Sequence, residues 1–137
     1  MLGYTVGNDL TSRYWQDPER SSSQAGYAKS FDGFGPIGPF IISTIFISDP
    51  GQLTLTVRVN GEQRQRANTN DLVFDVRSII RVLARGRTIR AGTIIMTGTP
   101  SGVGAFSTPP RFLKHGDVAE VEIEKIGLIK NRVVFQE

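Results

Sequence analysis

A hairpin signal in the middle of the chain constrains the fold most strongly. Apolar residues alternate with polar ones from Leu53 to Val59, and Asn60-Gly61 follows directly. Alternation with a period of two predicts a strand with one buried and one solvated face. Asn-Gly supplies the positive φ angles that a two-residue hairpin turn requires. The returning segment 62–67 is so polar that we expect it at a sheet edge or on a solvated face.

One helix is predicted after the hairpin, over residues 75–85. Asp75 can cap its start and Gly86 can end it. An apolar stripe and a row of arginines alternate at helical spacing, which is typical of an amphipathic helix with one wet face. The stripe is formed by Val76, Ile79, Ile80, Leu83 and Ala84, and the wet face by Arg77, Arg81 and Arg85.

The remaining segments also favour strands. We expect further strands at 3–8, 40–47, 93–97, 117–124 and 128–135, with 40–47 and 93–97 buried, a helical turn or two at 9–16 and a mobile loop at 17–28. There is no internal repeat and no linker. The prediction is an α+β, mostly β architecture in which residues 1–137 form one folding unit or part of one.

Composition excludes several classes of function. The 137 residues include no cysteine, which rules out a disulfide framework, a thiolate zinc site and a cysteine nucleophile. No basic-then-apolar signal segment opens the chain, and the most apolar stretch, 39–47, is about half of a membrane span. We therefore expect a soluble protein with no membrane partner, located in the cytoplasm, with the mitochondrion left open.

The charge balance is basic, but it does not indicate nucleic-acid binding. The net charge is +3, and much of the positive charge is arginine between Arg58 and Arg90. No run of five or six like charges occurs, and no aromatic residues interleave with the arginines to stack on bases. We expect solvated arginines on the outer faces of a strand and a helix, and no nucleic-acid partner.

Two charged residues could take part in chemistry. Asp9 follows a predicted strand, where a carboxylate suits a hard cation such as Mg²⁺; it could equally cap the turn that follows. Lys29 lies where a polar loop meets the glycine-rich segment 29–39. It could neutralise negative charge on a bound enolate or carboxylate, or be an ordinary surface lysine.

The loop GTPSGVG, residues 98–104, could bind an anion. It has little side-chain bulk, so that backbone amides and hydroxyls could approach a ligand closely. It lacks the ending of a phosphate-binding P-loop and precedes no clear helix, which argues against a nucleotide. A purely structural turn is the alternative.

Two further groups favour a structural role. Glu120, Glu122 and Glu124 share one strand face, but residues two apart on a strand are nearly 7 Å apart, too far to grip one ion unaided. We interpret them as the wet side of a strand whose other side is core. His115, the single histidine, falls in a turn before a strand rather than in an evident cleft, so we do not expect it to act as a general base.

Five blocks of the sequence, taken together, resemble the fumarylacetoacetate hydrolase family. They occur in the family's order and cover nearly the whole chain, which makes the resemblance specific. The blocks are GYTVGNDLTSRYWQ (3–16), KSFDGFGPIGP (29–39), VNGEQRQRANTNDLVF (59–74), TIIMTGTPSGVG (93–104) and LKHGDVAEVEIEKIGLIKNRVV (113–134).

The resemblance implies a mixed β-sandwich roll, usually dimeric, that binds Mg²⁺ or a similar cation such as Mn²⁺ or Ca²⁺. Such enzymes act on 2-oxo and β-diketo acids by C–C hydrolysis, decarboxylation or isomerisation. By this resemblance Asp9 would ligate the metal, Lys29 would act in catalysis, and Gln16 would lie near the substrate. Thr99 and the adjoining Gly98 would contact the substrate carboxylate.

Some features of the family pattern are not matched. Family members carry a Glu-x-Glu pair before the block that starts at Gly3, together with an N-terminal lid, and we expect both to be absent from this chain. The glutamates 120–124 match the family's C-terminal strand instead. Tyr14 stands where an aspartate is common and Gly35 where many members have cysteine.

Two hypotheses follow from this partial match. In the first, the chain is a metal-dependent hydrolase or lyase of the family whose active site is incomplete in these residues. In the second, it is an inactive module that functions by oligomerisation with itself or with a complete homologue. A single carboxylate should bind Mg²⁺ weakly, because hard-cation sites generally use several anionic ligands.

Overall fold

A computed structural model of the chain describes residues 1–136, and within them it is mostly β, as predicted. The elements are β1 (Gly3–Gly7), α1 (Arg13–Gln16), α2 (Pro18–Ser21), η1 (Tyr27–Lys29), β2 (Ile37–Ser43), β3 (Thr54–Val59), β4 (Glu62–Asn68), η2 (Thr69–Asp71), α3 (Val76–Leu83), η3 (Gly104–Phe106), β5 (Val118–Ile123) and β6 (Gly127–Arg132). No helix among these is long and apolar enough to cross a bilayer.

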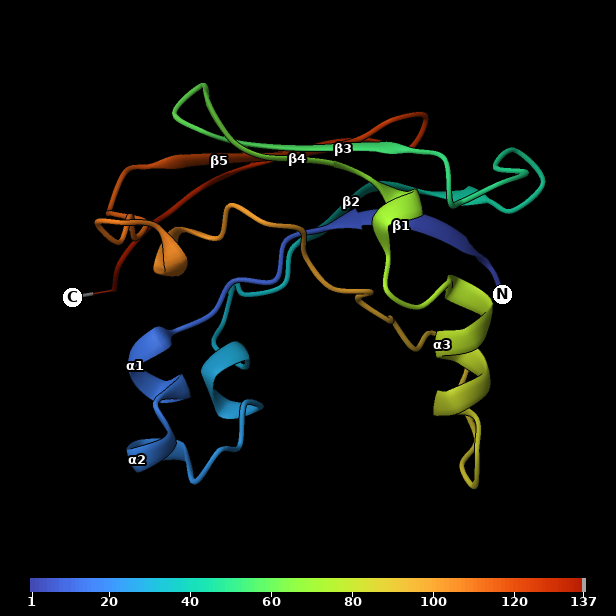
Figure 1. The fold of residues 1–137 in the computed structure, drawn as a ribbon, viewed down its shortest axis with the longest axis horizontal. Coiled ribbons are helices and arrows are strands. Elements are labelled where there is room, and N and C mark those ends of the chain that lie inside the picture. The colour runs from blue at the N-terminus through green and yellow to red at the C-terminus, as the bar shows by residue number, and fades with distance from the viewer. Residues whose placement is uncertain (137) are drawn as a thin grey trace.

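The strands form two sheets in two layers. A four-stranded sheet has the order β4-β3-β5-β6, and a two-stranded ribbon pairs β1 with β2. All pairings within the described residues are antiparallel. In Figure 1 the four-stranded sheet forms the upper layer, the β1–β2 ribbon lies beneath it, and the short helices extend below. The segment that joins α3 to β5 runs under the large sheet.

The predicted hairpin is confirmed. Asn60 and Gly61 have φ angles of 52° and 80°, as this turn requires. The polar strand β4 lies at the edge of the sheet, where unpaired backbone groups can be solvated. The β3–β4 register shifts between Val57 and Arg58, which brings Gln65 opposite Val57.

The core lies between the two layers. Its buried members come from β1, from β5 and β6, and from the connections around them; they are Val6, Ile47, Leu53, Val121, Ile126 and Ile129. Burying an aliphatic side chain of this size stabilises a fold by roughly 1.5–3 kcal/mol. The predicted division of β5, with Val121 in the core and the glutamates on the reverse side, is therefore confirmed.

The prediction of a buried strand at 40–47 is wrong. β2 begins earlier, at Ile37, and ends at Ser43, after which the chain turns. Phe40 and Ile41 are more than half exposed; only Ile47 of this segment is buried, and Ile42 is partly buried against the core. An apolar run is buried only where another layer covers it, and no described residues cover the outer side of β2.

The prediction of a buried strand at 93–97 is also wrong. These residues are irregular, and Ile94 is 57% exposed. A strand requires a neighbour for its backbone groups, and none of the described strands pairs with this segment.

The helical regions follow their local capping signals. The expected loop at 17–28 instead contains α2, because Asp17 accepts a hydrogen bond from the Glu19 amide and Pro18 occupies the first helical position. The turn at 9–16 is helical only from Arg13.

The last strand ends at Arg132, three residues earlier than predicted.

The predicted helix is confirmed as α3. The Asp75 side chain accepts a hydrogen bond of 2.6 Å from the Ser78 amide, and Gly86 follows the helix with φ 68°. The helix ends at Leu83, two residues earlier than predicted, so it contains Arg77 and Arg81 while Arg85 follows it; all three arginines are exposed, as expected. None of its apolar residues is buried, so the apolar stripe lacks a covering layer within residues 1–136.

Candidate functional site

The structure brings Asp9 and Lys29 into direct contact. Asp9 follows β1 and Lys29 ends η1, and the Lys29 ammonium donates to Asp9 Oδ2 at 2.6 Å. The same nitrogen donates to the Thr11 hydroxyl at 2.9 Å. Both charged side chains are partly open to solvent. An exposed pair of this kind adds little to stability, so the contact matters more for the placement of its charges.

Backbone contacts fix the two segments that carry this pair. The Ser12 amide donates to the Ala28 carbonyl at 2.9 Å, and Ala28 is fully buried. The Thr11 hydroxyl also bonds back to the Asp9 carbonyl at 3.3 Å. The carboxylate and the ammonium are therefore held together by chain segments that lie 20 residues apart.

Gln16 lies on α1 and pairs with a residue that the sequence did not single out. The Arg13 guanidinium donates to Gln16 Oε1. The same guanidinium carbon lies 5.4 Å from the centre of the Phe106 ring, within range of a cation–π contact. Arg13 thus connects α1 to the segment that follows the glycine-rich loop.

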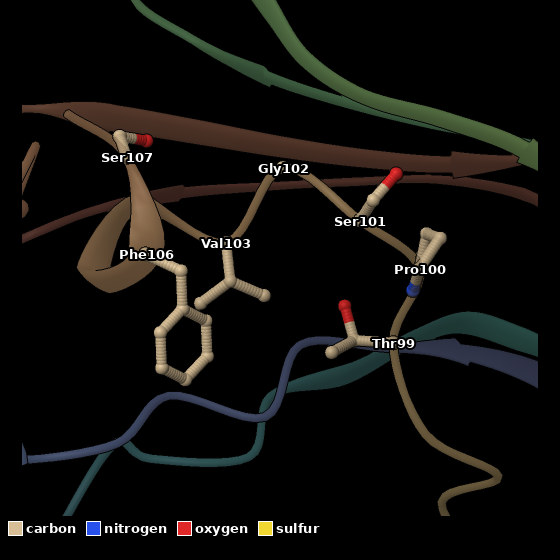
Figure 2. A pocket seen from close by; sticks show the side chains of 7 residues that line it. All are labelled: Thr99, Pro100, Ser101, Gly102, Val103, Phe106 and Ser107. Carbon is tan, nitrogen blue, oxygen red and sulfur yellow. The ribbon is translucent and has the colours of Figure 1, made fainter.

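Thr99 borders a pocket of about 520 Å³. The pocket is lined by Thr99, Pro100, Ser101, Gly102, Val103, Phe106 and Ser107. Figure 2 shows the Val103 and Phe106 side chains on the side of the loop that Thr99 also faces. The predicted loop at 98–104 is irregular backbone from 98 to 103, with Gly98 at φ 103°, and its last residue, Gly104, begins η3. Among residues 1–136, no hydrogen bond joins Thr99 or Gly98 to the Asp9–Lys29 pair.

Gln65 is a contact of this loop that sequence reasoning missed. Its side-chain amide nitrogen donates to Thr99 Oγ1 at 2.9 Å and to the Pro100 carbonyl at 2.8 Å. The sequence offered only one signal for this contact, a polar residue in a strand predicted at a sheet edge or on a solvated face. The register shift that turns Gln65 toward the core side of the sheet could not be read from periodicity.

Asp9 fits a metal site as one ligand rather than as a complete set. Within residues 1–136 there is no group of three or more acidic, histidine or cysteine side chains that could hold an ion. The Asp9 carboxylate supplies the hard oxygen donors that Mg²⁺ prefers, and one of them, Oδ2, is paired with Lys29.

The two glutamates of β5, the glutamate that follows it and the histidine have structural partners, as expected. Glu120 pairs with Lys130 at 2.7 Å, Glu122 with Arg58 at 3.0 Å, and Glu124 accepts from the Thr54 amide at 3.1 Å. The partners of the glutamates lie on β3 and β6, the two strands next to β5. His115 Nδ1 accepts from the Phe135 amide at 3.2 Å, which ties the turn to the C-terminal segment.

Electrostatic shifts concentrate on carboxylates that hold turns and loops. The Asn60 amide and the Lys114 backbone amide keep the pKa of Asp117 below its ordinary value. The Arg111 guanidinium, bound to Glu62 at 2.6 Å, lowers the pKa of that carboxyl in the same way. These groups fasten the β3–β4 turn and the segment before β5 to the rest of the sheet.

Comparison with known proteins gives a consistent set of similarities. A family model described as fumarylacetoacetate (FAA) hydrolase C-terminal matches residues 1–134. The mitochondrial oxaloacetate tautomerase FAHD2A of Bos taurus is 44% identical over 134 residues, which are 98% of this chain and 42% of the relative.

Solved structures agree over the same region. A fumarylacetoacetate hydrolase from the psychrophile Exiguobacterium antarcticum superposes with a TM-score of 0.92 at 41% identity, covering 98% of this chain and 47% of that one. The 5-carboxymethyl-2-hydroxymuconate delta-isomerase of Mycobacterium smegmatis gives a TM-score of 0.85 at 37% identity, covering 98% and 49%. The chain thus spans less than half the length of these relatives.

Proposed function

The chain belongs to the fumarylacetoacetate hydrolase family, and from this premise we propose that residues 1–137 form a single catalytic domain that carries part of an active site for small 2-oxo or β-diketo acids. The observation that carries the proposal is the contact between Lys29 Nζ and Asp9 Oδ2 at 2.6 Å. It places a fixed positive charge beside a carboxylate at the end of a strand.

The reaction class is enolate chemistry. Family reactions include C–C hydrolysis, decarboxylation and isomerisation, and the names of the bovine and mycobacterial relatives favour tautomerisation or isomerisation. In a tautomerisation, a proton leaves the carbon beside the oxo group, the electron pair moves onto the oxo oxygen, and a proton is returned at the other position. No bond between heavy atoms breaks, so the barrier depends on stabilising the transient enolate charge.

Each proposed site residue has a role that suits its chemistry. Lys29 would place its ammonium near the developing negative charge on the enolate oxygen. Thr99 and the Gly98 backbone would orient the substrate carboxylate at the pocket, which limits the geometries from which the proton is lost. Gln16, held by Arg13, would contact the substrate from α1.

Asp9 would hold a divalent cation, Mg²⁺ or alternatively Mn²⁺ or Ca²⁺, as the one ligand that the described residues provide. When bound, such a cation supplies Lewis-acid polarisation of the oxo group. Lys29 would then exchange its contact with Asp9 for a contact with substrate. The remaining ligands would come from other polypeptide, from substrate oxygens and from water.

The test is Mn²⁺ binding, followed by electron paramagnetic resonance with and without oxalate, a mimic of a 2-oxo acid enolate. We expect oxalate to strengthen Mn²⁺ binding in the wild-type chain and Asp9→Asn to abolish that effect. Asp32→Asn is the matched control, because Asp32 is an exposed aspartate with no side-chain hydrogen bond in the described part of the chain. Equal binding by wild type and Asp9→Asn would overturn the assignment.

A second candidate function is that of an inactive module that associates with itself, as a homodimer, or with a complete homologue. The apolar surface supports it: Phe46, Val73 and Phe74 are mainly exposed although they are large. Conversion of enol to keto oxaloacetate by the chain with Mg²⁺ separates the two candidates. Turnover that disappears with Asp9→Ala supports an enzyme, and undetectable turnover in a chain that self-associates supports the module.

The compartment and partners follow the same reasoning. The bovine relative is mitochondrial by name, and we propose the cytoplasm or the mitochondrion for this chain. The proposed partners are the small acid substrate and a second copy of the chain, with no nucleic acid and no membrane.

A further inference from the structure

Gln65 holds the loop that carries Thr99 through three hydrogen bonds. Its Nε2 atom donates to Thr99 Oγ1 at 2.9 Å, to the Pro100 carbonyl at 2.8 Å and to the Ser101 carbonyl at 3.2 Å. One side chain from β4 therefore contacts three successive residues of a loop 34 to 36 positions further along the chain.

These partners fix the orientation of the Gln65 amide. Backbone carbonyls can only accept hydrogen bonds, so the nitrogen and not the oxygen of the amide must face the loop. The amide has two hydrogens for three acceptors, so one hydrogen must be shared between two of them. The Ser101 contact, the longest of the three, is the one that shares a hydrogen. It follows that Gln65 is the donor toward the Thr99 hydroxyl.

The loop also lies against the β4 backbone, which supports the same contact independently. Gly102 has φ 96°, and a Cβ atom added there would lie 2.2 Å from the Arg64 carbonyl oxygen. No side chain fits between the loop and the strand at this point. The approach places the Gln65 amide, one residue further along β4, within reach of the loop carbonyls.

The direction of the bond determines what Thr99 can offer to a ligand. A hydroxyl has one hydrogen, and the Thr99 oxygen already accepts from Gln65, so its own proton stays available. The Thr99 hydroxyl makes no other hydrogen bond among residues 1–136. We infer that Gln65 is a positioning residue: it holds Thr99 so that the threonine hydroxyl donates a hydrogen bond into the pocket. The pocket therefore favours a ligand with an acceptor at this point, such as a carboxylate oxygen.

This inference rests on the proposed function for the identity of the ligand, but not for the geometry. The geometric part can be measured in the free protein by amide NMR of the full chain. Thr99→Val removes the acceptor of Gln65 while keeping the shape, so we expect the Gln65 side-chain NH₂ signals to shift. Thr97→Val is the matched control, because the Thr97 hydroxyl has no hydrogen bond in the described residues, and it should leave those signals in place.

The ligand part uses oxalate as the probe and NMR titration as the readout. We expect Gln65→Glu, which faces the loop carbonyls with acceptors only, to weaken oxalate binding roughly tenfold or more. Gln63→Glu adds the same charge on the same strand at an exposed residue and should change affinity by less than about twofold. Thr99→Ser should retain the affinity, and the Gln65→Glu and Thr99→Val effects should not add, because both remove one interaction.

The outcomes separate this inference from the proposed function. If oxalate fails to bind the wild-type chain while Thr99→Val still shifts the Gln65 NH₂ signals, the anion site is wrong and the positioning contact stands. If oxalate binds but Gln65→Glu and Gln63→Glu weaken it equally, the inference is overturned and the anion site stands. Unmoved Gln65 signals in Thr99→Val would overturn the inference in either case.

Discussion

The two sides of this molecule use similar apolar residues with opposite results. On the four-stranded sheet, Val121 and Ile129 lie on a face that the β1–β2 ribbon covers, and they are buried. On β2 and α3, residues such as Phe40 and Val82 form surfaces that are more than half exposed. Figure 1 shows α3 extending away from both sheets.

The chain therefore has one core that is covered by both layers, and a set of apolar surfaces, on β2 and α3, that nothing in the described residues covers. Apolar pattern decides which side of an element could be buried, whereas a second layer decides whether it is. Contiguous exposed apolar surface in a protein commonly marks an interface. We therefore propose the exposed set as a surface for association with further polypeptide, and the predictions below probe the contrast.

The largest effect is expected from a pair of isoleucines two residues apart. Ile47 is 4% exposed and Ile45 is 85% exposed. Ile47→Ala leaves a cavity in the core and should lower the free energy of unfolding by roughly 2–5 kcal/mol. Ile45→Ala should change it by less than about 0.5 kcal/mol. Urea unfolding measures both, and equal losses would show that Ile45 is buried in solution by another surface.

The second effect concerns association. If the exposed apolar surface is covered by a second copy, Phe46→Asp should raise the dimer dissociation constant at least roughly tenfold, equivalent to about 1.4 kcal/mol. Sedimentation equilibrium measures it. Ser48→Asp, which places the same charge two residues away on a residue that is already polar, is the control. A wild-type chain that stays monomeric at high concentration would contradict this prediction.

The third effect is a loss of folding stability at low pH, which arises at a carboxylate beside the four-stranded sheet. The folded state holds the pKa of Asp117 below its ordinary value of 3.8. A carboxylate with a lowered pKa in the folded state contributes stability that is fully present above its unfolded pKa and is lost as pH falls through the folded value. Unfolding at neutral pH and near pH 3 should show a loss toward acid.

Two variants identify the source of that loss. Asp117→Asn removes the titrating group, and Asn60→Ala removes its side-chain donor, which lies 2.9 Å away. Both should make the difference in unfolding free energy between the two pH values smaller than in the wild-type chain. A difference as large as in the wild type would show that other carboxylates cause the loss.

The smallest effect is expected on the outer face of the large sheet. Arg58 and Glu122 form a 3.0 Å ion pair that is partly open to solvent. Glu122→Gln should change the free energy of unfolding by only about 0.2–1 kcal/mol, less in high salt. Thermal unfolding at two salt concentrations measures it. A larger, salt-independent loss of stability would mean that another surface covers this face in solution. The outer face of the large sheet would then join β2 and α3 among the surfaces proposed to bind further polypeptide.

Local signals predicted much of the fold. The turn at Asn60-Gly61 and the cap at Asp75 depend on residues within a few positions of each other, and both are confirmed. The alternation of β5 also predicted which of its faces is buried, but in β3 the buried residue is Thr56, which belongs to the face predicted to be solvated. These features follow from backbone preferences that need no distant partner.

Predictions that depended on distant neighbours were weaker. The segment 93–97 has the composition of a buried strand, but no described strand accepts its hydrogen bonds. In the candidate site, Asp9 and Lys29 were candidates from their positions in the sequence, the family resemblance supplied their roles, and their contact could be seen only in the fold. Gln65 was missed because its orientation depends on a register shift in β4, which periodicity cannot reveal.

The central position of β3 has a consequence for the order in which the chain folds. One edge of β3 pairs with β4 through a two-residue turn, whereas the other pairs with β5, and the Thr54 amide meets a glutamate 70 residues later. Local hairpins close in microseconds, and contacts across long separations form later. During synthesis, one edge of this strand therefore stays without its partner until β5 has also emerged from the ribosome.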